Sequence, residues 1–268
     1  MEVKSGYGLD TQSELKQLTT IVEVAAKTRI NLIATCLAAH ILPKDFSGNQ
    51  AEYLNYVLHD LLPVIKQKSL SNRVDIFIEE SAFSADNAFM YLEKAKQMGF
   101  DITVHADQFT TGGSEVAVKL GAVSADHLEA SKDAEIKMIA NSGTVAVVLP
   151  GASLGLGMPY SPARKLLDAG ACLAIASDWN PGSAPMGDLL MQAAVISAAE
   201  KLNTAEVFAG LTYRAAKALN LYDRGTIAPG KRAHLQAYQC RDYREILYNQ
   251  GALKPNFLLV SEIPYKDN

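Results

Sequence analysis

Short apolar runs alternate with longer segments of helical periodicity along most of the 268-residue chain. This alternation is typical of repeated βα units around a parallel sheet. Seven runs are predicted strands, and they span residues 2–6, 31–39, 73–79, 101–105, 122–127, 144–149 and 171–178. Helical segments separate them, and the first opens with the capping box Thr11-Gln12-Ser13-Glu14. The sequence therefore predicts an α/β fold.

The number of βα units is one short of a closed parallel barrel, which has eight. An open seam would leave backbone groups unpaired on two edge strands. Because a strand is already in progress at residue 2, we expect the chain to lack its first unit. The predicted fold is an incomplete (β/α)8 TIM-like barrel over residues 1–222, with strands two to eight present. Residues 223–268 form a C-terminal tail, a remnant of a small β-sandwich with short strands near 233–238 and 256–260.

The charge and composition of the chain narrow the class of partner. Its 25 basic and 29 acidic residues are interspersed, for a net charge of −4, so a nucleic-acid-binding face is not expected. No apolar stretch is long enough to span a bilayer, so a membrane partner is not expected either. The three cysteines, Cys36, Cys172 and Cys240, are odd in number and widely spaced, which suits reduced packing residues in a cytoplasmic protein.

Four polar side chains close predicted strands: His40, His105, His127 and Asp178. In a βα barrel the active site lies at the C-terminal ends of the strands. A single histidine there is more often a satisfied structural residue, but imidazole and carboxylate groups on several strands are typical ligands of Zn²⁺ or Fe²⁺. The two remaining histidines, His59 in a helical run and His234 in the tail, are predicted to be structural.

Several motifs extend this pattern. They read HADQ at 105–108, GAVSADHLE at 121–129, SGTVAVVLPGA at 142–152, DWNPGS at 178–183 and KSGYGL at 4–9. With these motifs the sequence resembles the imidazolonepropionases, metal-dependent cyclic amidohydrolases of histidine degradation. The resemblance implies hydrolysis of imidazolone propanoate to N-formimino-L-glutamate, with one divalent metal, Zn or Fe. The glycine-rich run 151–157 lacks the lysine and hydroxyl ending of a phosphate-binding loop.

The resemblance also assigns roles to single residues. It implies that His105 and Asp178 are metal ligands and that His127 is a catalytic histidine. Asp178 also has the chemistry of a proton shuttle, so we expect it to be catalytic as well. The implied substrate contacts are Tyr7, His40, Gln108, Asn180, Gly182 and Ser183.

The chain departs from this family in one important respect. Members carry a His-x-His pair at the end of the first barrel strand, and no such pair occurs in this sequence. We therefore expect an imidazolonepropionase that is active only when the missing segment is restored or supplied by another chain. The sequence leaves two alternatives open: a non-catalytic fragment or oligomerising remnant, and another cyclic amidohydrolase or deaminase. A homodimer is also compatible with the sequence.

Overall fold

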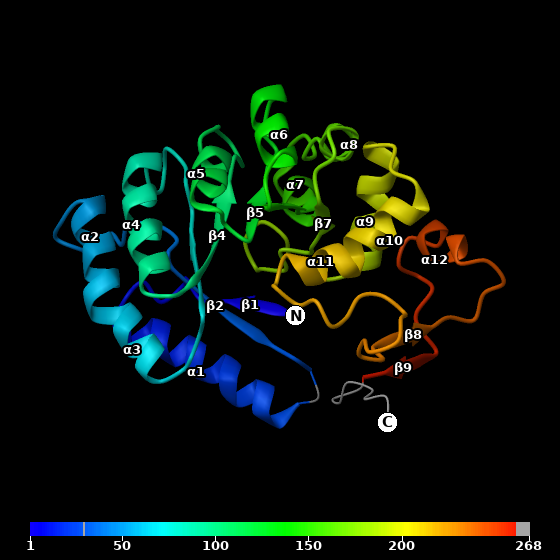
Figure 1. Ribbon diagram of the computed structural model, residues 1–268, viewed down its shortest axis with the longest axis horizontal. Coiled ribbons are helices and arrows are strands. Elements are labelled where there is room, and N and C mark those ends of the chain that lie inside the picture. Colours follow the sequence, from blue (N-terminus) through cyan, green and yellow to red (C-terminus); the bar gives the residue numbers. More distant parts are fainter. Residues whose placement is uncertain (29, 261–268) are drawn as a thin grey trace. The chain divides into compact units, whose positions relative to one another are not determined.

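A computed structural model describes residues 1–28 and 30–260 (Figure 1). The chain divides into two compact units. The first contains residues 1–126 and 142–144, and the second contains residues 127–141 and the chain from 145 onward. Each unit is described by itself below. The boundary predicted at residue 222 lies inside the second unit and stays a prediction.

The first unit is built on parallel strands that follow one another in chain order: β1 (Glu2–Lys4), β2 (Ile33–Ala39), β3 (Arg73–Ile76) and β4 (Asp101–Ala106). The register places Lys4 opposite Thr35 and Thr35 opposite Arg73. The next strand, β5 (Ser124–His127), begins just after Val123, whose N–H donates to the carbonyl of Ile102 in β4. The parallel pairing predicted from the sequence is confirmed.

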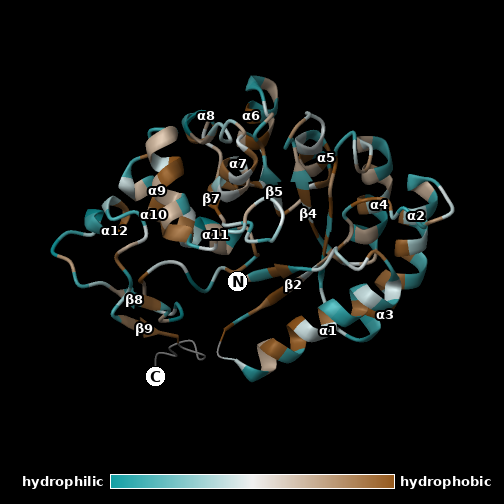
Figure 2. Ribbon diagram, turned by 180° about the vertical axis from the view of Figure 1, so that it is seen from behind, coloured by the Kyte–Doolittle hydropathy of each residue, from teal (hydrophilic) through white to brown (hydrophobic). Residues whose placement is uncertain are grey.

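Helices connect these strands and cover the sheet. They are α1 (Thr11–Lys27), α2 (Gln50–Tyr56), the π-helix η1 (Val57–Leu61), α3 (Leu62–Gln67), α4 (Ala85–Gln97) and α5 (Gly113–Leu120). Helix α4 packs against both α2 and α5 (Figure 1). The apolar positions of α1 recur at helical spacing (Figure 2), and Leu18 on that helix is fully buried.

The strands of the first unit carry two kinds of buried residue in alternation. On β3, Val74 and Ile76 are fully buried, and so is Asp75 between them. On β4, Thr103 and His105 alternate in the same way with apolar neighbours. Successive side chains of a strand point to opposite faces, so one face of this sheet is an apolar core and the other is a buried polar layer. The polar layer is where the candidate site is found.

The second unit has its own parallel pair, β6 (Val145–Val148) with β7 (Leu173–Ile175), and an antiparallel pair, β8 (Leu235–Ala237) with β9 (Phe257–Leu259). Its helices are α6 (Asp133–Ala140), α7 (Pro150–Leu156), α8 (Ala163–Asp168), α9 (Leu189–Ala199), α10 (Thr204–Leu211), α11 (Tyr213–Lys217) and α12 (Arg244–Tyr248). The core around β6 and β7 is aliphatic and includes Val145, Val147 and Ala174. The two short tail strands fall where the sequence predicts them.

The helices of the structure bear on two further predictions, a membrane span and the role of His59. Among residues 1–28 and 30–260, no helix is both long and apolar enough to cross a membrane. His59 is exposed on the helical stretch and its Nδ1 lies 2.8 Å from the carbonyl of Asn55, which agrees with a structural role.

Candidate active site

Four aromatic rings meet at the C-terminal ends of the strands in the first unit. Tyr7 and His40, which follow β1 and β2, have ring centroids 5.4 Å apart. The ring of His105 on β4 lies 6.5 Å from that of His40. Phe77, which follows β3, lies 6.0 Å from each of the two histidines. Three residues predicted for the site are thus brought together, and Phe77 joins them without having been predicted. We call these four residues the ring cluster.

The loop that carries Tyr7 is held by a buried carboxylate on α1. Glu14 accepts hydrogen bonds from the N–H groups of Gly6, Gly8 and Leu9 at 3.0, 2.8 and 3.0 Å. Gly6 has a φ of 110°, and a Cβ there would lie 2.6 Å from the carbonyl oxygen of Leu37, so only glycine fits. The loop before α1 is therefore fixed in place, and it fixes the position of Tyr7.

The same loop sets the tautomer of His40. Its Nδ1 lies 3.0 Å from the carbonyl oxygen of Gly6. A carbonyl oxygen can only accept, so Nδ1 must carry the proton. In the neutral ring Nε2 is then an acceptor. His40 can therefore accept a hydrogen bond from an N–H or O–H group of a ligand.

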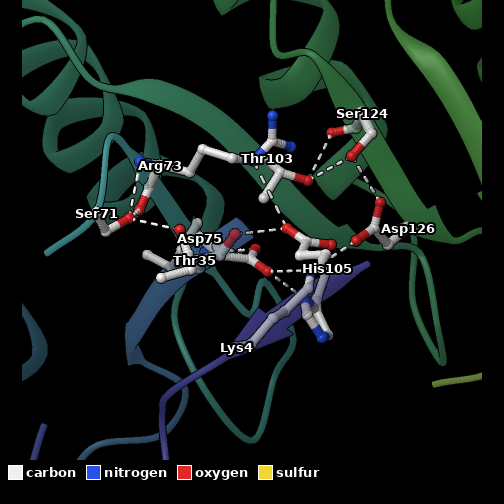
Figure 3. A network of polar contacts seen from close by, with 12 residues as sticks. Lys4, Thr35, Ser71, Arg73, Asp75, Thr103, His105, Ser124 and Asp126 are labelled. Carbon is white, nitrogen blue, oxygen red and sulfur yellow. Dashed lines mark hydrogen bonds and ion pairs between the residues drawn. The ribbon is translucent and has the colours of Figure 1, made fainter. Parts of the chain in front are cut away.

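His105 stands in a charged network on the polar face of the sheet (Figure 3). Its Nδ1 lies 2.9 Å from Oδ2 of Asp75. The ammonium of Lys4 lies 2.6 Å from that same Asp75 oxygen and 2.7 Å from Oδ2 of Asp126. Burial by itself would lower the pKa of His105, but the carboxylate of Asp75 raises that pKa above its ordinary value. Burial acts on Asp75 in the opposite sense, yet His105 and Lys4 hold the pKa of Asp75 below its ordinary value.

A further layer of polar residues supports this network. Ser124 donates to Asp126 at 2.8 Å, and its hydroxyl lies 2.5 Å from that of Thr103. On the other side, Glu2 accepts a hydrogen bond from Thr35 at 2.6 Å. Ser124 and Asp126 lie two residues apart on β5, and the other two contacts join neighbouring strands. The sequence offered a signal for them, because polar residues at alternating positions of buried strands require partners.

The network contains three donors in a metal-like arrangement, since single ligand atoms of Asp75, His105 and Asp126 lie within 4.8 Å of one another. The ammonium of Lys4, however, is already within hydrogen-bonding distance of both carboxylates. A second cation there would face a fixed positive charge, so this trio does not fit a metal. His105 can nevertheless bind a metal outside this trio. A ring nitrogen held by a carboxylate is the usual arrangement of a metal-binding histidine, which coordinates through its other nitrogen.

The loop after β4 contains Gln108, a predicted substrate contact. Glu79 accepts from the N–H groups of Phe109 and Thr110 at 2.8 and 3.0 Å and from the Thr110 hydroxyl at 2.7 Å. Asp107, with a φ of 52°, accepts from residues at the start of α5. Gln108 itself is buried. Two carboxylates therefore fix this loop, and neither was predicted as a site residue.

In the second unit, His127 is fully enclosed and conformationally strained. It is 2% exposed and has a φ of 85°, a region that non-glycine residues rarely adopt. Its Nδ1 lies 3.7 Å from Oε2 of Glu129, and Ser153 donates to the other oxygen of Glu129 at 2.8 Å. Ser161 donates to the His127 carbonyl at 2.6 Å. Strain that packing maintains is common at functional sites, and the catalytic role of His127 stays a prediction.

The loop after β7 contains Asp178, whose φ is 47°. Within it, Asn180 accepts from the N–H groups of Gly182 and Ser183 at 2.8 and 2.9 Å and donates to the Asp178 carbonyl at 2.6 Å. These bonds give Asn180 a structural role in shaping the loop. The predicted metal role of Asp178 and the predicted substrate contacts of Asn180, Gly182 and Ser183 stay predictions.

Comparison with known proteins places the chain. A model of the amidohydrolase family matches residues 3–247. The chain belongs to the amidohydrolase family. Among its amidohydrolase relatives, an imidazolonepropionase of Bacillus cytotoxicus is 39% identical over 259 residues, which cover 96% of this chain and 61% of the relative. An imidazolonepropionase of Deinococcus deserti is 43% identical over 253 residues, covering 94% and 62%. The chain thus spans about three fifths of the length of these curated relatives.

Solved amidohydrolase-like structures agree in fold. A triazine hydrolase variant superposes with a TM-score of 0.74 at 15% identity and covers 97% of this chain and 66% of its own. A zinc-bound adenosine deaminase from Xanthomonas campestris has a TM-score of 0.69 at 19% identity, covering 92% and 63%. These identities support the fold alone. The predicted amidohydrolase barrel class and the resemblance to imidazolonepropionases are confirmed.

Proposed function

We propose that this amidohydrolase chain carries the substrate-binding part of an imidazolonepropionase, an enzyme that hydrolyses imidazolone propanoate to N-formimino-L-glutamate. The observation that supports it most is the ring cluster. Tyr7, His40 and His105 come from motifs separated by up to about a hundred residues, yet their rings lie within 6.5 Å of a neighbour. Tyr7 is 61% exposed, so a ligand from solvent can reach the cluster at this residue.

The substrate fits the chemistry of the ring cluster. An imidazolone ring offers a flat face and ring N–H groups, and His40 presents an acceptor nitrogen. Tyr7 and Phe77 offer aromatic surfaces, and flat rings pack well against such surfaces. Gln108 adds an amide that can both donate and accept. We propose that Tyr7, His40 and Gln108 bind the ring, as the resemblance implies.

The residues of this chain provide part of a metal site. His105 and Asp178 offer an imidazole and a carboxylate, which suit one divalent Zn or Fe. When bound, such a metal acidifies a water and polarises the carbonyl that the water attacks. Catalytic zinc sites usually have three protein ligands, so these two alone make an incomplete set. The proposed activity therefore depends on at least one further ligand.

Two further residues would move protons or stabilise charge. The Asp178 carboxylate would take a proton from the attacking water and deliver it to the ring nitrogen as the C–N bond opens. His127, with Glu129 beside its Nδ1, would orient the water or stabilise the developing oxyanion. The proposed substrate is a small molecule. The described cysteines form no disulfide, which suits the proposed cytoplasmic location.

The test is an assay on the metal-loaded chain, alone and co-expressed with the part of the Deinococcus deserti relative that lies outside the matched region. Imidazolone propanoate is compared with adenosine, a chlorotriazine and a cyclic ureide. We expect the co-expressed preparation to convert imidazolone propanoate to formiminoglutamate and to turn over none of the other three substrates. His105→Ala and Asp178→Asn should abolish it, while His59→Ala, at an exposed helical histidine, should leave it unchanged.

Each other outcome has a definite meaning. If metal is bound and no substrate is turned over in either preparation, the chain is a non-catalytic remnant and the proposal fails. Turnover of adenosine, the triazine or the ureide instead would identify another amidohydrolase. Product formation that survives His105→Ala would remove the proposed ligand role of His105.

A further inference from the structure

The ammonium of Lys4 lies between Asp75 and Asp126 and contacts both carboxylates. The two carboxylates are almost fully enclosed, with side-chain exposures of 0% and 7%, and Lys4 itself is 21% exposed. Two enclosed carboxylates this close need a neutralising cation, because like charges in a low-dielectric interior repel strongly. The ammonium meets this need from β1, the first strand of the chain.

One oxygen of Asp75 links Lys4 to His105. Oδ2 lies 2.6 Å from the Lys4 ammonium and 2.9 Å from Nδ1 of His105 (Figure 3). A carboxylate that is held ionised by an ammonium can only accept hydrogen bonds. We therefore expect Nδ1 of His105, 2.9 Å from this oxygen, to carry the proton. Nε2 is then the nitrogen with which His105 would bind a metal.

Without Lys4 the same place would have the properties of a metal site. Asp75, His105 and Asp126 would present one nitrogen and two carboxylate oxygens within 4.8 Å, a donor set that suits a divalent transition metal. A metal bound there would take Nδ1 of His105 away from Asp75. The imidazole would then no longer be oriented for a metal at its other nitrogen.

We propose that Lys4 is a positioning residue, a built-in cation that keeps metals out of the Asp75–His105–Asp126 trio and holds Nδ1 of His105 on Asp75. The consequence for catalysis rests on the proposed function, in which His105 is a metal ligand through Nε2. The occupancy of the trio by Lys4 does not rest on it. The two parts are therefore tested by readouts that do not use activity.

The first experiment measures metal content. The 268-residue chain, Lys4→Met, Lys4→Arg and Lys119→Met are each equilibrated with Zn²⁺, desalted and analysed by mass spectrometry and by zinc titration calorimetry. Lys119 is the matched control because it is exposed on α5 and forms an ion pair with Glu115, which is also exposed. We expect Lys4→Met to gain about one Zn²⁺ per chain over the parent, since the three freed donors suit zinc. The gain should disappear in Lys4→Met with Asp126→Asn.

Arginine keeps the charge, so Lys4→Arg should gain no zinc, and the same holds for Lys119→Met. A folded Lys4→Met chain that binds no more zinc than the parent would overturn the proposal. A gain of the same size in Lys119→Met would overturn it as well.

The second experiment needs no folded variant at position 4. Long-range ¹H–¹⁵N spectra of the histidine-labelled, metal-free parent chain report which ring nitrogens carry protons, and the His105 signals are identified by their loss in His105→Gln. We expect a protonated Nδ1. An unprotonated Nδ1 in the parent would refute the proposal. If Nδ1 is protonated while the substrate assay fails, the role of Lys4 stands and the proposed function alone falls.

Discussion

Glu14 offers the sharpest prediction about what holds the candidate site in place. Its carboxylate is fully buried and accepts from the N–H groups of Gly6, Gly8 and Leu9. Hydrogen bonds to charged groups contribute about 1.5–3 kcal/mol each. The N–H groups of Gly8 and Leu9 are only partly buried, so in Glu14→Ala water can replace the carboxylate as their acceptor and recover much of the lost stability. Removing a buried charge also recovers a little stability, because the desolvation cost of that charge disappears. The N–H of Gly6 is buried and would be left unsatisfied.

Together these terms give a loss of about 3 kcal/mol in the free energy of unfolding for Glu14→Ala. Glu14→Gln keeps an acceptor oxygen and should lose about 1 kcal/mol. The matched control is Glu23→Ala on the exposed side of the same helix, for which we expect a change within about 0.5 kcal/mol.

The assay is native-state hydrogen exchange of β2 amides, which reports the first unit even if the chain unfolds in more than one step. Glu14→Ala should also speed exchange at Gly8 and Leu9 before any global opening. A loss in Glu14→Ala no larger than in Glu23→Ala would show that the carboxylate does not hold the Tyr7 loop.

Two other positions give predictions of the same kind. Glu79→Ala should lower the free energy of unfolding by about 2–4 kcal/mol, because that carboxylate accepts three hydrogen bonds from one loop. The same change should speed hydrogen exchange at the amide of Thr110. The exposed neighbour Glu80 is the control, and equal losses in the two alanine variants would contradict the role of Glu79. Gly113→Ala should lower the free energy of unfolding, measured by thermal unfolding, by about 1–3 kcal/mol, because a Cβ there would lie 2.7 Å from the backbone of β4. Gly143→Ala meets nothing within 4 Å and should be nearly neutral, so similar shifts in melting temperature for the two variants would contradict the close packing of α5 on β4.

Much of the fold could be predicted because it depends on local patterns. Each predicted strand has an observed counterpart, from β1 at Glu2–Lys4 to β7 at Leu173–Ile175, because apolar runs bounded by polar residues determine strands over a few residues. All of the observed strands except β4 are shorter than the predicted ones, and β4 runs one residue further, to Ala106. His40 and His105 were found because both terminate such runs.

The polar network could not be predicted from the same patterns. Lys4, Asp75 and Asp126 are up to 122 residues apart, and their contact depends on the register between strands. A sequence pattern shows only that each alternates with apolar neighbours. Phe77 was missed for a similar reason, because an aromatic residue at a strand end has no distinctive signal until its ring is placed beside two histidines.

The central claim is that the ring cluster binds the imidazolone substrate, and ligand titration tests it most directly. In histidine-labelled chain, imidazolone propanoate should shift the ring signals of His40 and His105, whose centroids lie 6.5 Å apart, and should leave the exposed His59 unchanged. The shifts should saturate and should be weakened by Tyr7→Ala. Unchanged His40 and His105 signals at saturating ligand, or equal shifts at His59, would contradict the account.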